Sequence, residues 1–181
     1  MKNDSLDVTE VLKDQHDQIR RAFTRAAVPG RGRARAFQQL VQMLSTHEAA
    51  EQAHIHSTVR RAGRGATAAA RQGEEEQAKE LLARLWQIGP GGRGYLGCLR
   101  SLRRAVLAHA AREEREEFPV LAGLGRARRR MLGLEVKLAK ELAPTRPHPK
   151  VNGDLANRLA MPVLGPADRC RDLLDRWRAR N

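Results

Sequence analysis

Two pairs of histidine and glutamate repeat the same spacing in this chain of 181 residues. His47 lies four residues before Glu51, and His109 lies four residues before Glu113. Residues four apart on an α-helix share one face, so each pair presents an imidazole and a carboxylate side by side. Imidazoles and carboxylates bind transition metals, and inward-facing carboxylates build metal sites in helix bundles. The two pairs therefore predict a metal site, provided that both helices face one core.

A third histidine, His16, lies on the apolar stripe of the N-terminal segment, four residues after Leu12 and three before Ile19. Taken alone, a buried histidine is more often a hydrogen-bonded core residue than a ligand, and one such pair is often a surface ion pair. Here an apolar stripe leads into both pairs, and two unpaired carboxylates in one core would cost several kcal/mol without a cation. The combination favours a metal site over either alternative.

The elements that must position these residues are helices. Ala, Leu, Arg and Glu dominate the sequence, and aromatic residues make up only 3%. Apolar periodicity, interrupted by Gly and Pro, predicts helices over residues 7–27, 33–61, 67–88 and 95–121. Short turns make successive helices antiparallel, so we expect an all-α, up-and-down four-helix bundle. The second and fourth helices then run in the same direction, and the three histidines lie at similar heights.

Two features are expected beyond the four helices. Pro119 lies in the last turn of the fourth helix and should kink or end it. A basic stretch then predicts a shorter fifth helix that ends near residue 142. We expect the bundle to occupy residues 1–143. Residues 144–181 are expected to form a proline-containing C-terminal extension with a short helix over 166–178.

The net charge of +13 would attract polyanions. An alternative function is therefore a basic interaction module, in which Arg126, Arg128, Arg129 and Arg130 contact nucleic acid or an acidic protein. The few aromatic residues offer little surface for base stacking, and no zinc-finger or RNP-type motif is present. The simpler interpretation is that the arginines lie on solvated helix faces.

Other classes of protein find little support. The sequence has no GxSxG, HExxH or phosphate-loop motif, which argues against a conventional hydrolase. No apolar run reaches the length of a membrane helix, and the first residues are too polar for a signal peptide, so a cytoplasmic protein is expected. Cys98 and Cys170 are far apart and are interpreted as free thiols.

Three segments of the chain carry a family resemblance: DQHDQIRRAF, LSTHEAAEQAHIHSTV and LAHAAREEREEFPVL. They resemble the core motifs of the hemerythrin-like HHE cation-binding family, and the resemblance covers roughly residues 5–122. The PHP sequence and the tail resemble extensions of actinobacterial members. The resemblance implies a non-haem di-iron site that binds or reacts with O2, peroxide or NO, or that senses or handles iron. His16, His47 and His109 would be terminal ligands, and Glu51 and Glu113 would bridge the two irons.

The sequence departs from the family pattern in its third helix, which has no histidine. Gln77 stands where a histidine is expected, and Glu74, one turn earlier, could supply a carboxylate instead. Glu48 and His54 are further candidates on the second helix. His56 is expected to point away from the site, and His148 is expected to face solvent.

The second metal position is therefore less complete than the first. A di-iron site with a carboxylate-rich second metal, a mononuclear site and a site that has lost its metal all remain open. More carboxylate and less imidazole would favour an oxidase, peroxide-consuming or iron-handling role over reversible O2 carriage.

Overall fold

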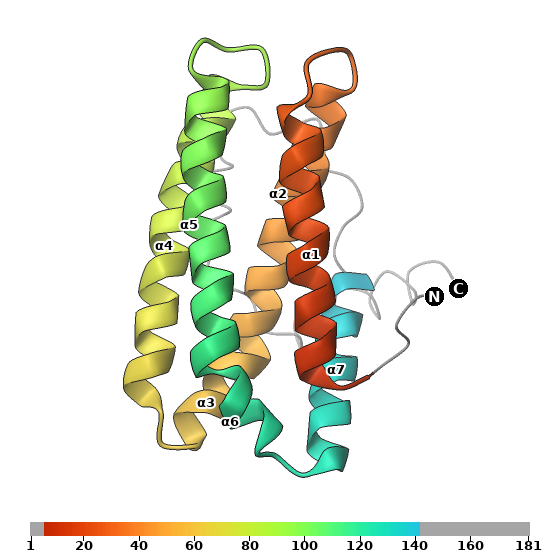
Figure 1. Ribbon diagram of the computed structural model, residues 1–181, viewed down its shortest axis with the longest axis vertical. Coiled ribbons are helices and arrows are strands. Elements are labelled where there is room, and N and C mark those ends of the chain that lie inside the picture. Colours follow the sequence, from red (N-terminus) through yellow and green to blue (C-terminus); the bar gives the residue numbers. More distant parts are fainter. Residues whose placement is uncertain (1–5, 142–181) are drawn as a thin grey trace, which may run out of the picture. The chain divides into compact units, whose positions relative to one another are not determined.

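The computed structural model describes residues 6–141, which form a helical bundle without strands. The bundle is built from four long helices, α1 (Val8–Ala27), α2 (Arg33–Ala50), α4 (Gly65–Ile88) and α5 (Tyr95–Glu116) (Figure 1). Helix α1 packs against α2 and α5, and α4 packs against α5. Successive long helices run antiparallel, so the predicted up-and-down bundle is confirmed.

The second helix is continuous but irregular. Helix α2 passes directly into a π-turn, η1 (Glu51–Ile55), which passes into α3 (His56–Arg61). The N–H of His56 donates to the carbonyl of Glu51, five residues earlier. A π-turn holds one residue more than the corresponding α-turns. Side chains beyond Glu51 are therefore displaced by one position from those of the uninterrupted α-helix that the sequence predicted.

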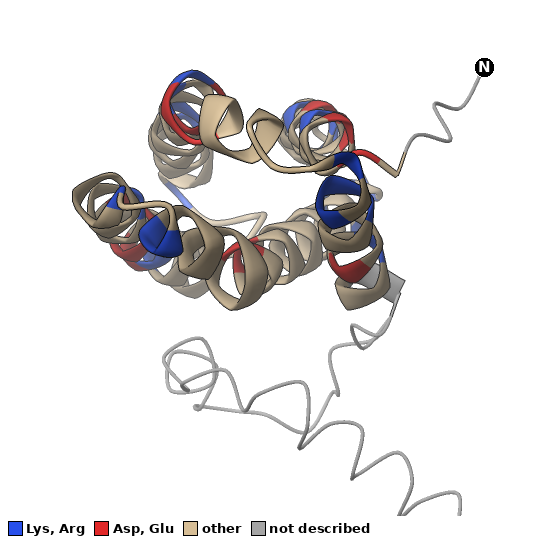
Figure 2. Cartoon of the chain, turned by 90° about the horizontal axis from the view of Figure 1, so that it is seen from below, with Lys and Arg blue, Asp and Glu red and all other residues tan. Residues whose placement is uncertain are grey.

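The fourth helix breaks where Pro119 predicted. Helix α5 ends at Glu116, and the short helix α6 (Phe118–Ala122) begins after Glu117 with proline in its first turn. Proline has no N–H to donate and fixes its own φ, so it suits the start of a new helix. The predicted fifth helix is also present as α7 (Arg126–Glu141), which packs on α1 and α2. Figure 2 shows the helices end-on around their common interior.

Two apolar cores lie at different heights in the bundle. Ile19, Phe23, Leu40, Leu85 and Tyr95 belong to the core nearer the α1–α2 and α4–α5 loops. A second core, nearer α6 and α7, contains the residues Val8, Leu12, Ile55, Val59, Leu121 and Leu132. Along each long helix, the buried polar residues fall between these two groups. The sequence thus places a polar layer inside the bundle with apolar packing above and below it.

The two loops at one end are tied together. The Tyr95 hydroxyl donates to the Ala26 carbonyl at 3.2 Å, and the Arg33 guanidinium donates to the Pro90 carbonyl at 3.3 Å. Gly89 and Gly94 adopt positive φ angles of 69° and 93° in the α4–α5 loop, a conformation that glycine adopts at little cost. The short turn expected between the third and fourth helices is therefore present.

Within residues 6–141, no helix combines the length and the apolar character that a membrane crossing requires. Cys98 is a half-buried free thiol. The expected C-terminal extension, with its short helix, His148 and Cys170, lies outside the described residues, and the domain boundary at residue 143 stays a prediction.

Candidate metal centre

The first group of potential ligands lies in the polar layer of the bundle. It contains His16 from α1, His47 from α2, Glu51 from η1 and Glu113 from α5. All four are buried, and one ligand atom from each lies within 4.8 Å of the others. Nε2 of His16 lies 3.1 Å from Oε2 of Glu113, and Nε2 of His47 lies 2.9 Å from Oε1 of Glu51. The structure thus brings together four of the five residues that the sequence singled out first.

The second group contains Glu51, Glu75 from α4 and His109 from α5. Its ligand atoms also lie within 4.8 Å of one another, and all three residues are buried. Nε2 of His109 lies 3.7 Å from Oε2 of Glu51. Glu51 therefore belongs to both groups, with one oxygen toward His47 and the other toward His109. A carboxylate in this position can bridge two ions.

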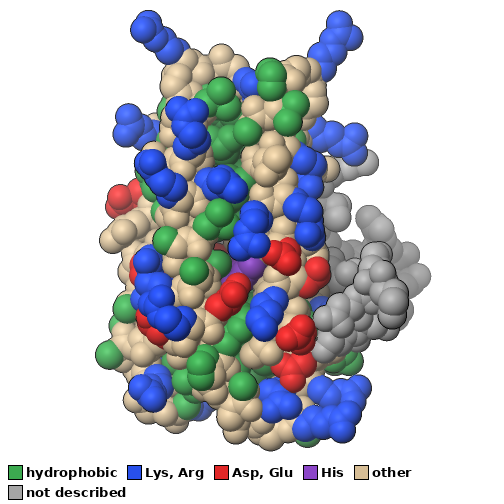
Figure 3. All heavy atoms as spheres, viewed as in Figure 1, with side chains coloured by type: hydrophobic (Ala, Val, Ile, Leu, Met, Phe, Trp, Pro, Cys, Tyr) green, Lys and Arg blue, Asp and Glu red, His purple; other side chains and the backbone are tan. Residues whose placement is uncertain are grey.

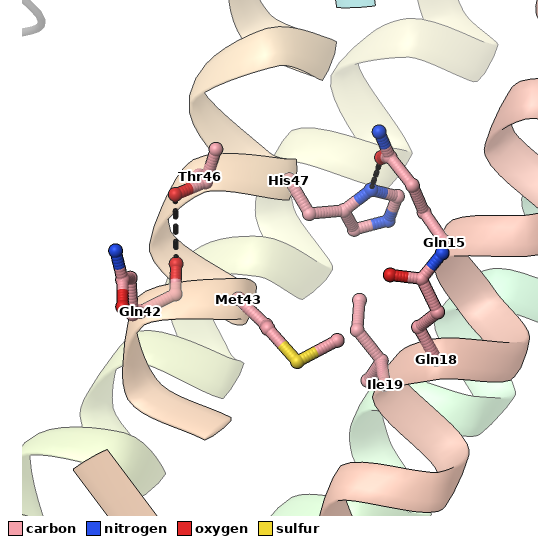
Figure 4. A pocket seen from close by; sticks show the side chains of 7 residues that line it. All are labelled: Gln15, Gln18, Ile19, Gln42, Met43, Thr46 and His47. Carbon is pink, nitrogen blue, oxygen red and sulfur yellow. Dashed lines mark hydrogen bonds between the residues drawn. The ribbon is translucent and has the colours of Figure 1, made fainter. Parts of the chain in front are cut away.

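All three of these histidines are held by Nδ1 and turn Nε2 toward the interior of the site. Oxygens of Glu114, Gln15 and Glu74 lie 2.8, 2.7 and 3.1 Å from Nδ1 of His16, His47 and His109, in that order. Each oxygen can accept the Nδ1–H, which leaves the Nε2 lone pair for a metal. Figure 4 shows the Gln15 side chain at the His47 ring.

His56 was expected to point away from the site, and this expectation is wrong. Its side chain is completely buried, with Nε2 2.5 Å from Oε1 of Glu75 and Nδ1 3.5 Å from Oε1 of Glu117. The cause is the π-turn. On a regular helix His54 would follow Glu51 on the inner face, but the extra residue in η1 turns His56 inward instead. His54 lies outside both groups, and its Nδ1 is 3.2 Å from a carboxylate oxygen of Glu135 on α7.

Glu75 is the functional candidate that the sequence analysis missed. It stands in a run of three glutamates, of which Glu74 was the predicted ligand. The sequence left the inner face of α4 open among these three residues. In the structure Glu75 shares that face with Ala68 and Leu82, which are buried and lie seven residues away on either side. The amide of Gln52 donates to Oε2 of Glu75 at 3.1 Å, so both oxygens of this carboxylate are held.

The remaining candidates from the sequence lie outside the two groups. Gln77 is exposed and does not replace a third-helix histidine in this structure. Glu74 accepts from His109 and forms ion pairs with Arg112 at 2.6 Å and Arg71 at 3.0 Å. Glu48 pairs with Lys79 at 2.6 Å. Glu74 therefore supports a potential ligand, while Glu48 neutralises a lysine beside the site.

The charges in the site shift one another's proton affinity. Burial alone would lower the pKa of His16, but its contact with the Glu113 carboxylate raises it to about 9. In the same way, burial alone would lower the pKa of His109, but its contact with the Glu51 carboxylate raises it to about 9. Burial and the charge of Glu51 raise the pKa of Glu113 to about 8. Burial opposes ionisation of Glu51, but His47 and His109 hold its pKa well below the usual value.

Several buried atoms in the site have no hydrogen-bond partner. They include Nε2 of His16 and of His109, Oε1 of Glu51, and both carboxylate oxygens of Glu113. Leaving a buried polar atom unpaired costs about 1–3 kcal/mol, and more for a charged group. Bound cations would satisfy these atoms together, because every one of them is a metal-binding nitrogen or oxygen. The residues present therefore fit a metal centre.

Two cavities reach the site. One of about 190 Å³ lies between α1 and α2 and ends at His47 (Figure 4). A smaller one of about 50 Å³ lies among α2, α4 and α5, where Glu51, Glu75 and His109 form part of its wall. The rest of that wall consists of the polar side chains of His47 and Glu48, one cation, Lys79, and five aliphatic residues. Its aliphatic residues are Leu44, Ala78, Leu82, Leu102 and Val106.

Comparison with known proteins gives the same assignment. The sequence model for the hemerythrin HHE cation binding domain matches residues 7–121. The fold is similar to the crystal structure of a hemerythrin HHE cation binding domain-containing protein from Mycobacterium kansasii. The TM-score is 0.67 and the sequences are 24% identical, over 75% of this chain and 85% of the mycobacterial one. No curated protein matches the chain significantly.

Proposed function

Because this chain belongs to the hemerythrin HHE cation-binding domain family, we propose that it holds two iron ions in the polar layer of its bundle. There it would bind or react with O2, peroxide or NO. The position of Glu51 carries the proposal, since its two oxygens face two separate groups of potential ligands. Bound iron would supply open coordination positions and redox chemistry.

The ligand sets of the two positions differ. His16, His47, Glu51 and Glu113 would hold one ion. The sequence analysis expected Glu113 to bridge both ions, but its carboxylate lies in this group alone. Glu51, Glu75 and His109 would hold the other, with Glu75 in place of the histidine that the third helix lacks. The second position is thus the richer in carboxylate relative to imidazole. This balance favours oxidant consumption or iron handling over reversible O2 carriage, because carboxylates stabilise the more highly charged, oxidised metal.

The cavity beside the second position limits what can react there. Its volume of about 50 Å³ exceeds the roughly 10–15 Å³ that a cavity needs to hold one water, so a molecule of two or three heavy atoms fits. Leu44, Leu82, Leu102 and Val106 line it with aliphatic surface. A space of this size admits O2, NO or peroxide and excludes a larger substrate, and its aliphatic residues favour the apolar molecules O2 and NO.

Metal content measures the proposal directly. Wild-type protein, loaded anaerobically with ferrous iron and freed of excess metal, should retain two ions per chain. The Glu51→Ala variant should lose both, because Glu51 belongs to both groups. The His16→Ala and Glu75→Ala variants should each lose one. The matched control is Glu76→Ala, which removes an exposed carboxylate next to Glu75 and should retain two.

Peroxide, O2 and NO are then added separately to the loaded protein, and its absorption spectrum is followed. A response that Glu75→Ala reduces and Glu76→Ala leaves intact supports reaction at the second position. Iron near zero in the folded wild-type protein would refute the metal assignment. Two irons without a response to any of the three molecules would leave a role in iron handling and refute the reaction.

A further inference from the structure

Positive charge is concentrated at one end of the bundle. Residues 18–47 and 81–112 contain no Asp, Glu or Lys, but each segment contains six arginines. Together these twelve arginines account for nearly all of the chain's net charge of +13. They are Arg20, Arg21, Arg25, Arg31, Arg33, Arg35, Arg84, Arg93, Arg100, Arg103, Arg104 and Arg112. We call the part of the bundle formed by these two segments the arginine end.

The fold brings the two segments together. Residues 18–47 are the second half of α1, the loop and most of α2, while residues 81–112 are the end of α4, the loop and most of α5. In an antiparallel bundle both segments occupy the end that carries these two loops (Figure 1). Figure 3 shows basic side chains over the upper part of one face, with most acidic side chains lower down. The segregation in sequence is therefore a segregation in space.

Most of these arginines are available for contact. All except Arg33 and Arg112 are exposed. Within the described part of the chain, Arg20 is the only exposed member with a carboxylate partner, Asp17 at 2.6 Å. Elsewhere in the bundle, by contrast, basic side chains form ion pairs with acidic ones, as Arg129 does with Asp7. Arginines spread evenly over solvated faces would not leave both of these segments without a single carboxylate.

We propose that the arginine end binds the phosphodiester backbone of duplex nucleic acid, without reading its sequence. Guanidinium groups match phosphate oxygens in a two-pronged geometry, and neither segment contains lysine. Arginines exposed on helix surfaces can contact the phosphates of the nucleic-acid backbone, and these contacts give affinity because they release the counterions bound there. The proposal is independent of metal binding, because none of the exposed arginines lies in the metal centre.

Two other polyanionic partners fit the surface less well. Protein interfaces are built around buried apolar or aromatic anchors. The only large hydrophobic residues of the arginine end that are markedly exposed are Val28 and Leu96, among the residues described. Stable attachment to a membrane surface takes an apolar contribution as well as basic residues, and the apolar faces of α1, α2, α4 and α5 are packed in the core. Charge without apolar anchors points to a phosphate backbone.

The test is fluorescence anisotropy of a labelled 30-base-pair DNA duplex, titrated with the full chain at several salt concentrations. One variant changes Arg21, Arg25, Arg100 and Arg103 to Gln, all exposed on α1 and α5. The matched control changes four exposed arginines outside the arginine end to Gln: Arg60, Arg61, Arg126 and Arg130. Both variants lose the same charge, and circular dichroism verifies that each is folded.

We expect wild-type protein to bind, with log K falling linearly as log salt rises. The first variant should reduce the slope by about one for each arginine that contacts phosphate, and by two or more in total. The control should retain the wild-type slope to within about one. Equal losses in the two variants would refute the arginine end as the site. Absence of binding at 50 mM salt, or binding of polyglutamate as tight as that of DNA, would refute a nucleic-acid partner.

Discussion

Loading the metal centre should release protons, and the structure sets how many. At pH 7 the site holds protons on groups whose pKa values are raised: His16 to about 9, His109 to about 9 and Glu113 to about 8. Groups with these pKa values are about 90–99% protonated at pH 7. Glu51 holds none, because its pKa is lowered.

Metal ligands must give up these protons, since a metal binds neutral imidazole and ionised carboxylate. We therefore expect release of about three protons per fully loaded chain at pH 7, and fewer as the pH rises through 8 and 9. Metal binding should strengthen as the pH rises, because the pKa values of these ligands are raised. At a pH below these pKa values protons compete with the metal for the ligands, and at a pH above them they no longer compete. The overall constant for loading both ions should thus rise by about three powers of ten per pH unit below pH 8, because each released proton contributes one power of ten.

Isothermal titration calorimetry in buffers of different ionisation enthalpy measures the proton count directly. Mn²⁺ is a suitable redox-inert probe, with anaerobic ferrous iron as the second metal. The control is Glu76→Ala, whose exposed carboxylate lies outside both groups. Release of less than one proton at pH 7, or release that grows from pH 7 to pH 9, would contradict the assignment of these three groups as protonated metal ligands.

Three further changes test the surroundings of the centre. His56→Gln removes the imidazole that holds Glu75, and should weaken one of the two metal sites by about 10–100-fold while the other is retained, as measured by competition with a chelator. Leu85→Ala leaves a cavity at a completely buried position of the core nearer the α1–α2 and α4–α5 loops. It should lower the free energy of unfolding, measured in urea, by about 2–5 kcal/mol. Tyr95→Phe removes only the hydrogen bond to the Ala26 carbonyl, and should cost about 1 kcal/mol in the same assay.

The first metal group was predictable because it depends on regular helices. The spacing of His47 and Glu51 fixes their common face, and the apolar stripes fix which face is buried. Pro119 likewise predicts the end of α5, since a proline has no N–H to donate and its ring clashes with the preceding turn of a helix. These features need only the local backbone rules of an α-helix, which any window of sequence contains.

The second group depended on details that those rules leave open. Any one of three adjacent glutamates in α4 could have faced the interior of the bundle. Packing against the other helices buries Glu75 rather than Glu74. His56 lay beyond reach because a π-turn has no strong signal in side-chain periodicity. It appears where widening the backbone by one residue satisfies buried contacts, here those of His56 with Glu75 and Glu117.

Because of the π-turn, the number of residues in this helical segment determines which side chains reach the site. A π-turn is equivalent to one residue inserted into an α-helix, so Glu51–Ile55 has the footprint of a small insertion. An alignment of this chain with a relative that keeps a regular helix there needs a one-residue gap inside the helix. Without that gap, His56 is paired with a surface position. Its contribution to the centre is then invisible to any comparison that matches the motif residue by residue.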